Sequence, residues 1–391
     1  MDRALVYLKE ALKILEAIRK EELPKLVDVA REATERSKAG GKLVSHIIWG
    51  HMVVDETRAD RPGQPGVLPQ WGWDARDRYC ELCEGDAVLT NEVHREVKEA
   101  RERGAYVAGF SVPYLPNKFA PPGTLVAQED PEILSIEEVS DVVLYCHVPY
   151  ENGLVRFPEI PQVPVCPGSA VAQVSFYWMA SAEVAYRLSD GELGRSPAEE
   201  YISVAMERVR RSEENLQTIR EAASGMAERV IRGGRFWVYQ KGRALVGEAC
   251  GRASGLMAPK PLDRKAWKAG DVVVVGAELP DEPEDLDVMR EARDLGAYSV
   301  AIGPEGETLS LADAALRDFG WEGVVEVPGH PRPVCPTSGL INAVLLWMLT
   351  AQFVEETIKR GEVPAVYMGV HLKGGREHNE KVKGLFERRG Y

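Results

Sequence analysis

One short stretch carries an imidazole and two carboxylates at spacings that suit acid–base chemistry. His51 precedes Asp55 by four residues and Glu56 by five, so a helix beginning here would place them on adjoining faces. Such a pair can give a proton to one atom of a substrate and take a proton from another. Glu248 occupies the matching place in the second half of the chain. The alternative interpretation is a helix cap or an exposed polar cluster without chemistry.

A second stretch concentrates positive charge at the predicted end of a strand. Lys241 and Arg243 flank Gly242, directly after an apolar run. Two cations around a flexible glycine can clamp an anion. A solvated turn has the same composition and is the alternative.

Hydroxyl residues stand before two long apolar segments. Ser169 precedes one of them, and Thr337 and Ser338 precede the other. Their first expected role is to cap a helix N-terminus, which is worth about 1 kcal/mol each. The same geometry leaves backbone N–H groups free to contact an anion, which is the second hypothesis.

The elements that would position these residues occur twice in the chain. Three landmarks return in the same order with a period near 190 residues, which is the size of a domain. We therefore predict a tandem duplication, with domains at 1–190 and 196–391, a linker at 189–195 and a site where the copies meet. The landmarks are GGKLV at 40–44 with GGRFWV at 233–238, GAYV at 104–107 with GAYSV at 296–300, and PVCPGS at 164–169 with PVCPTS at 333–338.

Helical periodicity alternates with short apolar runs, which predicts an α/β fold with a parallel sheet in each half and helices on both faces. Ligands of such sheets bind beyond the carboxyl ends of the strands. The helices are expected at 4–38 with a break near Pro24, between the strand at 87–89 and residue 103, and at 197–231, 244–254, 284–294, 310–318 and 338–359. The strands are expected at 43–49, 87–89, 106–112, 140–147, 236–240, 271–276, 298–302 and 323–327.

Composition excludes several classes of protein. The net charge is −13 and no Lys/Arg cluster occurs, so nucleic-acid binding is not expected. The longest apolar run, 341–354, is too short and too polar for a bilayer and predicts a buried helix. The N-terminus lacks the pattern of a signal peptide, so a cytoplasmic protein without membrane association is expected.

Metal and redox cofactors are not expected either. Cys80 and Cys83 form a lone C-x-x-C without the second pair that a zinc site needs. Cys166 and Cys335 lie in matching apolar contexts and are expected to be buried. No G-x-G-x-x-G follows a strand, which removes the nicotinamide fingerprint.

Several motifs resemble the bacterial sugar isomerase (SIS) domain family, once per copy and over nearly the whole chain. They are WGHMVVDE at 49–56, VSDVV at 139–143 with CHVPY at 146–150, RASGLMAP at 252–259, and the tail PAVYMGVHLKGGREHN at 364–379. The resemblance implies two flavodoxin-like α/β sandwich domains packed about a pseudo-twofold axis. It also implies a phosphosugar ligand and a homo-oligomer.

In that family a loop after the first strand and a hydroxyl-rich turn after the second strand hold the phosphate. The resemblance therefore adds Gly50 and Thr90 to the binding residues, and it implies that the tail carrying His378 and Asn379 folds over the site. The turn at 276–281 departs from the pattern, because it is acidic and has no hydroxyl. His147 and His371 are secondary candidates.

Together these residues predict a sugar-phosphate isomerase that acts through an enediol. Its base would be Glu248 or Glu56, and His51 or His378 would open the sugar ring. Lys241, Arg243, Thr337 and Ser338 would hold the anion. Two alternatives remain: a sugar-phosphate sensor without catalysis, and a lyase or deaminase acting on an uncharged or acidic sugar, which the acidic turn favours.

Overall fold

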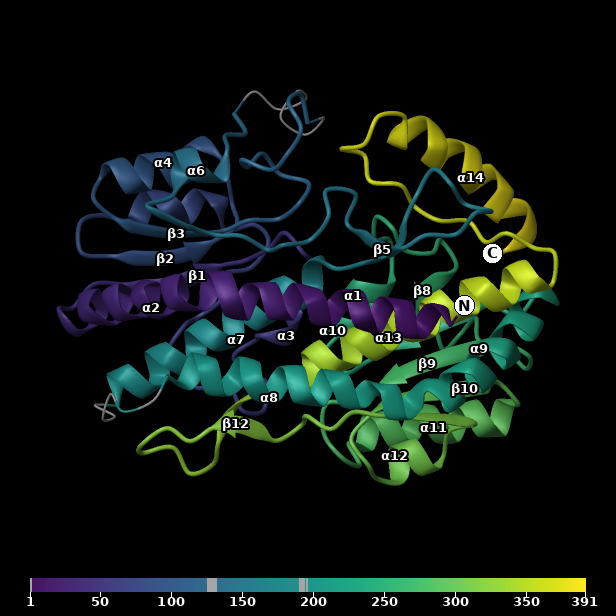
Figure 1. The fold of residues 1–391 in the computed structure, drawn as a ribbon. Helices are drawn as coiled ribbons and strands as arrows, with labels where there is room; N and C mark the ends of the chain where they lie inside the picture. Colours follow the sequence, from purple (N-terminus) through teal and green to yellow (C-terminus); the bar gives the residue numbers. More distant parts are fainter. Residues whose placement is uncertain (1, 125–131, 190–193, 195) are drawn as a thin grey trace.

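Each half of the chain builds its own parallel sheet in the computed structural model, which describes residues 2–124, 132–189, 194 and 196–391 (Figure 1). The first sheet has the order β1-β2-β3-β4, and the second β11-β10-β9-β7-β8. The strands of the first sheet are β1 (Leu43–His46), β2 (Ala87–Thr90), β3 (Tyr106–Phe110) and β4 (Val142–Leu144). Those of the second are β7 (Phe236–Tyr239), β8 (Pro259–Pro261), β9 (Val272–Gly276), β10 (Tyr298–Gly303) and β11 (Ala314–Arg317).

The sheets are covered on both faces, as apolar parallel strands require. Strand β9 shows this alternation: Val272 and Val274 join the large shared core, whereas Val273 and Val275 join a separate cluster on the opposite face. The helices of the first half are α1 (Arg3–Ala17), α2 (Leu23–Lys38), α3 (Met52–Glu56), α4 (Arg95–Glu102), α6 (Ile136–Val139) and α7 (Ser169–Leu188), with short turns η1 (Ile18–Glu22) and η2 (Arg76–Glu81). Those of the second are α8 (Pro197–Arg211), η3 (Ser212–Asn215), α9 (Leu216–Ile231), α10 (Ala244–Ala249), α11 (Pro283–Leu295), α12 (Glu307–Ser310), α13 (Ser338–Lys359) and α14 (Gly375–Arg389).

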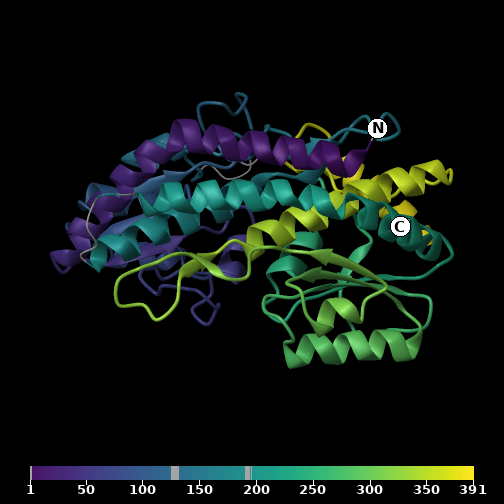
Figure 2. The same ribbon diagram turned by 60° about the horizontal axis from the view of Figure 1, so that its bottom comes forward.

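The long helices form a layer between the two sheets, and they cross from one half to the other (Figures 1 and 2). Helix α1 packs against α13 while α2 packs against α7, and α8 packs against α7 while α9 packs against α13. Each amino-terminal helical run therefore begins on the other half and ends on its own. The expected break near Pro24 is instead the π-helical turn η1, with Pro24 at the start of α2.

A short antiparallel pair in each half fastens that half to the other. Strand β5 (Gly153–Val155) pairs with β6 (Val165–Pro167), and β12 (Gly323–Val325) with β13 (Val334–Pro336). Within the repeated PVCP segments, Cys166 and Cys335 both have positive φ, 65° and 60°. Their backbone N–H groups donate across the junction, to the carbonyls of Ser254 and Gly63 respectively, at 2.8 Å.

Two sequence-based expectations are wrong in detail. The segment 310–318 was expected to be helical, but only the short α12 precedes it and β11 extends the sheet, because Ala314 and Leu316 face the core on an alternating pattern. No helix was expected after 359, but the GGREHN segment begins the helix α14. The expected domain boundary at 189–195 falls partly outside the described residues and stays a prediction.

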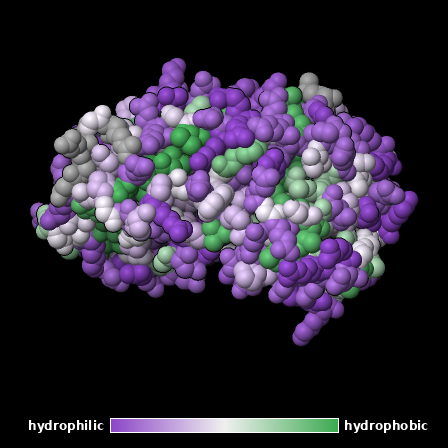
Figure 3. Space-filling model, turned by 90° about the horizontal axis from the view of Figure 1, so that it is seen from below, coloured by the Kyte–Doolittle hydropathy of each residue, from purple (hydrophilic) through white to green (hydrophobic). Residues whose placement is uncertain are grey.

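Helix α13 is the one helix of the described residues long and apolar enough to cross a membrane, and 94% of its apolar window is buried inside the fold. This confirms the expected core helix. The face of the molecule in Figure 3 is mostly hydrophilic, and its apolar areas are small and interrupted by polar residues.

The shared core leads to a prediction about unfolding. One cluster of buried residues joins α1 and α7 to α13, so the two halves should unfold in a single transition. Leu8 on α1 is 1% exposed, and we expect Leu8→Ala to lower the free energy of unfolding by about 2–5 kcal/mol. Scanning calorimetry measures both effects. The half-buried Leu12→Ala should cost clearly less, and two separate transitions in the wild type would contradict a common core.

Candidate functional site

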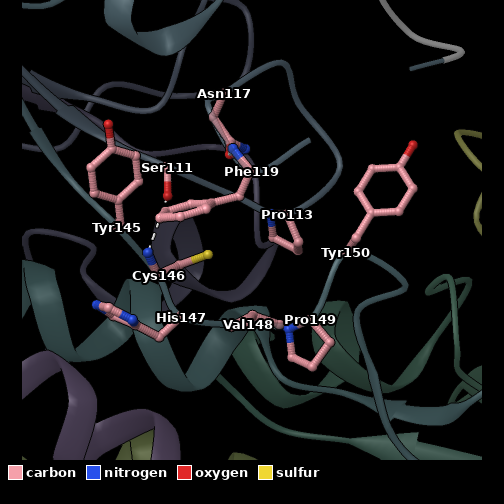
Figure 4. A pocket seen from close by; sticks show the side chains of 10 residues that line it. All are labelled: Ser111, Pro113, Asn117, Phe119, Tyr145, Cys146, His147, Val148, Pro149 and Tyr150. Atoms are coloured by element: carbon pink, nitrogen blue, oxygen red, sulfur yellow. Dashed lines mark hydrogen bonds between the residues drawn. The ribbon is translucent and has the colours of Figure 1, made fainter. Parts of the chain in front are cut away.

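A cavity of about 290 Å³ lies at the carboxyl edge of the first sheet (Figure 4). Its floor is made by residues that follow β3 and β4, which is where ligands of parallel sheets bind. The Ser111 hydroxyl accepts the backbone N–H of Cys146 at 3.0 Å. The Cys146 thiol points toward Pro113, whereas the His147 ring points away and contacts Glu22 of η1 at 3.0 Å. His147 thus lines the cavity with its backbone side, while its ring anchors this wall to η1.

The segment after α13 closes the same edge from the other half. The Tyr150 hydroxyl donates to the backbone carbonyl of His371 at 3.1 Å, and His371 Nε2 donates to the carbonyl of Tyr150 at 3.0 Å. Burial lowers the pKa of His371, so its ring is neutral near pH 7. The ring of Tyr114 lies 5.6 Å from that of His371. The carboxyl-terminal segment therefore contacts the edge of the first half through His371, and the expectation that the tail folds over the site stays a prediction.

Behind these rings lies a buried charged group that we call the Glu248 cluster: Glu248, Arg252, Ser169 and the carbonyl of Gly50. Arg252 donates to Glu248 at 2.8 Å, to the Gly50 carbonyl at 2.6 Å and to the Ser169 hydroxyl at 2.7 Å. Glu248 and Arg252 belong to the second half, and the other two groups belong to the first. The guanidinium of Arg252 thus bridges the junction.

Burial sets the protonation of this cluster. Desolvation raises the pKa of Glu248 to about 7, against the charge of Arg252 and a hydrogen bond from Trp347 Nε1 at 2.7 Å. Both carboxylate oxygens are therefore engaged. Desolvation and then the charge of Arg252 lower the pKa of His51 to about 3, so His51 is neutral at pH 7. Its ring packs against Trp73, which is 44% exposed, at 5.7 Å.

The equivalent group on the other side of the junction is the Glu56 cluster: Glu56, Arg61 and Ser338. Arg61 donates to Glu56 Oε1 at 3.2 Å and to the Ser338 hydroxyl at 2.7 Å. A Cβ added to Gly339, in the first turn of α13, would lie 2.1 Å from the Glu56 carboxylate. Desolvation raises the pKa of Glu56, and the charge of Arg61 opposes this rise. Oxygen Oε2 of Glu56 is buried without a hydrogen-bond partner among the described residues.

The Glu56 cluster has an additional ion pair beside it. Arg58 binds Glu278 through both nitrogens, Nη1 to Oε1 at 2.8 Å and Nη2 to Oε2 at 2.6 Å. Glu278 lies just beyond β9, in the acidic turn. A Cβ on Gly242 would lie 2.1 Å from Glu278 Oε1, so only glycine leaves room for this pair. Glu278 of the acidic turn is therefore paired with an arginine of the other half.

The structure brings together several of the residues expected from sequence. Gly50, Ser169 and Glu248 meet in one cluster. Glu56 and Ser338 meet in the other, and Gly242 borders it. Thr337 lies next to Ser338, and its hydroxyl accepts Arg208 at 2.9 Å. The expectation that serine hydroxyls at these helix starts serve as caps is not met, since neither α7 nor α13 has a side-chain cap.

Other expected residues have different surroundings. Lys241 is exposed and pairs with Glu282 and Glu284. Arg243 is exposed at the start of α10 with a φ of 62°. The Thr90 hydroxyl is buried and bonds the carbonyl of His46 at 2.9 Å. These three therefore lie outside both clusters.

The two tail residues hold the carboxyl-terminal segment in place. His378 Nε2 donates to the carbonyl of Val366 at 3.0 Å. The Asn379 side chain accepts the N–H of Met368 at 2.8 Å and donates to its carbonyl at 2.9 Å. Both side chains thus hydrogen-bond to the backbone of the segment that leads to His371.

The loop after β1 has no free N–H cradle at its start. Asn91 Oδ1 accepts the backbone N–H groups of Ile48 at 2.9 Å and Trp49 at 3.1 Å. In the second half Gln240 Oε1 accepts the N–H of Leu245 at 2.5 Å. Side chains of the protein itself therefore occupy donors that a phosphate could use.

Sequence reasoning missed the arginines. Glu248 and Arg252 are four residues apart, a spacing that favours an ion pair on a helix. No such signal marks Arg61, which lies beyond the end of α3, or Arg58, whose partner Glu278 is 220 residues away. Only the fold brings Arg58 to Glu278 and Arg61 to Glu56.

Curated proteins similar in sequence match only part of the chain. No family model matches the chain. A UPF0309 protein of Brucella anthropi is 28% identical over 141 residues, which cover 33% of this chain and 57% of the relative, so the chain spans little more than half of that protein. The UPF0309 protein BH0227 of Halalkalibacterium halodurans is 21% identical over 236 residues, covering 49% of this chain and 92% of the relative.

Solved structures show the same fold over most of the chain. A "putative phosphosugar isomerase" of Silicibacter pomeroyi matches with a TM-score of 0.52 and 12% identity, covering 93% of this chain and 99% of its own. A "putative sugar binding protein" of Salmonella typhimurium matches with a TM-score of 0.51 and 12% identity, covering 89% and 98%. The chain therefore has the two-domain α/β fold of the SIS sugar isomerases.

The buried carboxyl of Glu248 predicts a pH-dependent stability. Its folded pKa of about 7 lies above the ordinary value of 4.5, so the folded state holds a proton that the unfolded state loses as pH rises between these values. Stability is thus greatest below about pH 4.5 for this group and falls toward pH 7, by about 1.4 kcal/mol for each pKa unit. We expect Glu248→Gln to flatten the fall of Tm between pH 5 and pH 8.

The matched control is Glu10→Gln on α1, whose side chain is 37% exposed. It should leave the pH profile of Tm unchanged. An equal slope in Glu248→Gln and the wild type would show that Glu248 is ionised throughout this range in the folded protein.

Proposed function

We propose that this chain, which has the fold of the SIS sugar isomerases, binds a sugar phosphate or related sugar acid at the junction of its halves and interconverts its aldose and ketose forms. The observation that carries this proposal is Glu56 Oε2, a buried carboxylate oxygen without a hydrogen-bond partner among the described residues, beside a buried guanidinium and a helix start. Neighbours with the same fold are described as phosphosugar isomerases and a sugar-binding protein.

Glu56 is the better candidate for the base of the two buried glutamates. Both oxygens of Glu248 hold hydrogen bonds, whereas one oxygen of Glu56 is free to take a proton. In the proposed reaction Glu56 removes the proton from C2 of the open-chain aldose. The electrons of that C–H bond form the C1–C2 double bond while the π electrons of the C1 carbonyl move to O1, which gives an enediolate. The hydroxyl proton on O2 is transferred to O1, and the proton held by Glu56 is delivered to C1 as the C2 carbonyl forms, which gives the ketose.

The neighbouring groups have supporting roles in this proposal. Arg61 keeps two nitrogens, Nε and Nη1, without hydrogen-bond partners among the described residues, and these can donate to the negative charge that develops on the substrate oxygens. His51, the sequence-based candidate for ring opening, is neutral at pH 7, but the charge that affects its pKa is that of Arg252 in the Glu248 cluster, so we assign it no role beside Glu56. The phosphate or carboxylate of the substrate would lie at the arginine-rich side of the cluster.

A sensor without catalysis is the second candidate, and the closure of the clusters favours it. Glu56, Arg61 and Ser338 are fully buried, so a ligand reaches them only if the junction opens. A lyase or deaminase acting on an unphosphorylated sugar loses its sequence-based support, because Glu278 of the acidic turn is neutralised by Arg58.

Ligand binding is tested by a thermal-shift screen against hexose, pentose and amino-sugar phosphates, the parent sugars and sugar acids. A ligand at 100 times its Kd adds about 2.7 kcal/mol of stability. Turnover of each stabilising ligand is then followed by exchange of the C2 proton in D2O with NMR. We expect Glu56→Gln to keep the thermal shift but to lower turnover by about 100-fold or more.

Two further variants are measured for comparison with Glu56→Gln. Glu248→Gln should retain more activity than Glu56→Gln, and the exposed Asp287→Asn on α11 should behave as the wild type. Stabilisation by a sugar phosphate without any proton exchange in the wild type would establish the sensor. A Glu56→Gln variant with the full rate would remove Glu56 as the base.

A further inference from the structure

We propose that Glu278 is an internal substitute for the anionic group of the ligand, and that a phosphate or carboxylate displaces it from Arg58 and Arg61. This inference rests on the proposed function and names the anion subsite within it. The subsite differs from the Lys241–Arg243 clamp expected from sequence. In this proposal the anionic group of the ligand binds beside the Glu56 cluster and not beside the Glu248 cluster.

The pairing of Arg58 with Glu278 has the geometry of anion recognition. Two parallel N–H···O hydrogen bonds of 2.8 and 2.6 Å join the guanidinium fork to the carboxylate. The same fork binds a phosphate through two oxygens. The side chains are 24% and 10% exposed, so the pair lies at the edge of the buried cluster and can be reached from solvent.

Arg61 shows that Glu278 does not satisfy this subsite. Its side chain is fully buried, and Nε and Nη1 have no hydrogen-bond partner among the described residues. Nη1 lies 3.7 Å from Glu278 Oε2, which is too long for a hydrogen bond. A carboxylate has two oxygens, and both are held by Arg58. A phosphate has a third oxygen that can accept from Arg61 at the same time.

The turn after β9 allows this exchange. The Ala277 N–H donates to Ile302 at 2.8 Å and its carbonyl accepts Asn342 at 3.2 Å, so the backbone before Glu278 is fixed. The glutamate side chain has three rotatable bonds and can turn outward while the backbone stays in place. Gly242 leaves the space in which the carboxylate, or an anion in its place, lies.

The Glu248 cluster lacks this subsite. Counted from Gly242 as Arg58 is counted from Gly50, the matching residue is Cys250, which has no charge. The carboxylate at the matching position beyond β2 is Glu92, and it pairs with His94 instead. The duplicated clusters have therefore diverged, and each chain should bind one anionic ligand.

The test compares inorganic phosphate binding by wild-type protein and Glu278→Ala, using thermal shift and calorimetric titration. Arg58 Nε keeps its ion pair with Asp60 at 2.8 Å and Arg61 keeps Glu56, but removal of the internal carboxylate frees Nη1 and Nη2 of Arg58, so we expect phosphate to bind Glu278→Ala at least 10-fold more tightly than the wild type. The double variant Glu278→Ala/Arg58→Ala should lose this gain. Glu305→Ala, which removes the partner of the exposed Arg317, is the matched control and should bind phosphate as the wild type does.

Equal phosphate affinity in Glu278→Ala and the wild type would overturn the inference. If Glu278→Ala does not fold, Glu278→Gln keeps the side-chain volume without the charge and should still bind phosphate more tightly. The outcome is separable from the proposed function: a wild type stabilised by sugar phosphates together with an unresponsive Glu278→Ala rejects only the subsite. A responsive Glu278→Ala together with no sugar ligand rejects only the sugar.

Discussion

The burial of two guanidinium groups at the junction is the constraint on which the rest of the structure depends. A buried charge is tolerated only when ionic and hydrogen-bonding partners surround it, and removal of one partner leaves the other uncompensated. Arg252 and Arg61 each combine a glutamate of their own half with a serine at a helix start of the other half. These ion pairs lie within each half, but the guanidinium groups have their serine hydrogen-bond partners only when the two halves are docked together in this register.

The packing of the helices supports the same register. Each amino-terminal helical run begins on the opposite half, and the PVCP segments donate backbone hydrogen bonds across the junction. The carboxyl-terminal segment adds a third connection, from the end of α13 to the edge of the first sheet. Separate domains joined by a linker would have none of these contacts. The junction is a core of the protein, and a ligand that enters it must couple to the arrangement of both halves.

The near-symmetry of the two clusters makes their differences informative. Both contain a buried glutamate with a raised pKa and an arginine. In the Glu248 cluster, both carboxylate oxygens accept hydrogen bonds, which is typical of a structural group. In the other, a carboxylate oxygen and two guanidinium nitrogens lack partners and an ion pair adjoins them. Unsatisfied buried polar atoms are costly and are typical of functional sites. Under the proposed function, the Glu248 cluster contributes stability and the Glu56 cluster contributes binding.

The sequence alone predicted the alternation of helices and strands and the buried helix at 338–359, because burial leaves a periodic pattern in local sequence. It indicated Glu56 by its spacing from His51, and Glu248 by its matching place in the second half. It also predicted that the copies meet at a site. It failed for 310–318 and for α14, where neighbouring elements decide the conformation. The partners of charges that pair across the two halves were decided by tertiary structure alone. Arg58 meets Glu278 across 220 residues, and Lys241 and Arg243, cationic in the same way, remain at the surface. A charged residue whose partner lies in the other half carries no local signal of that partner, since such an ion pair depends on distance in space and on desolvation, and both arise only when the halves dock.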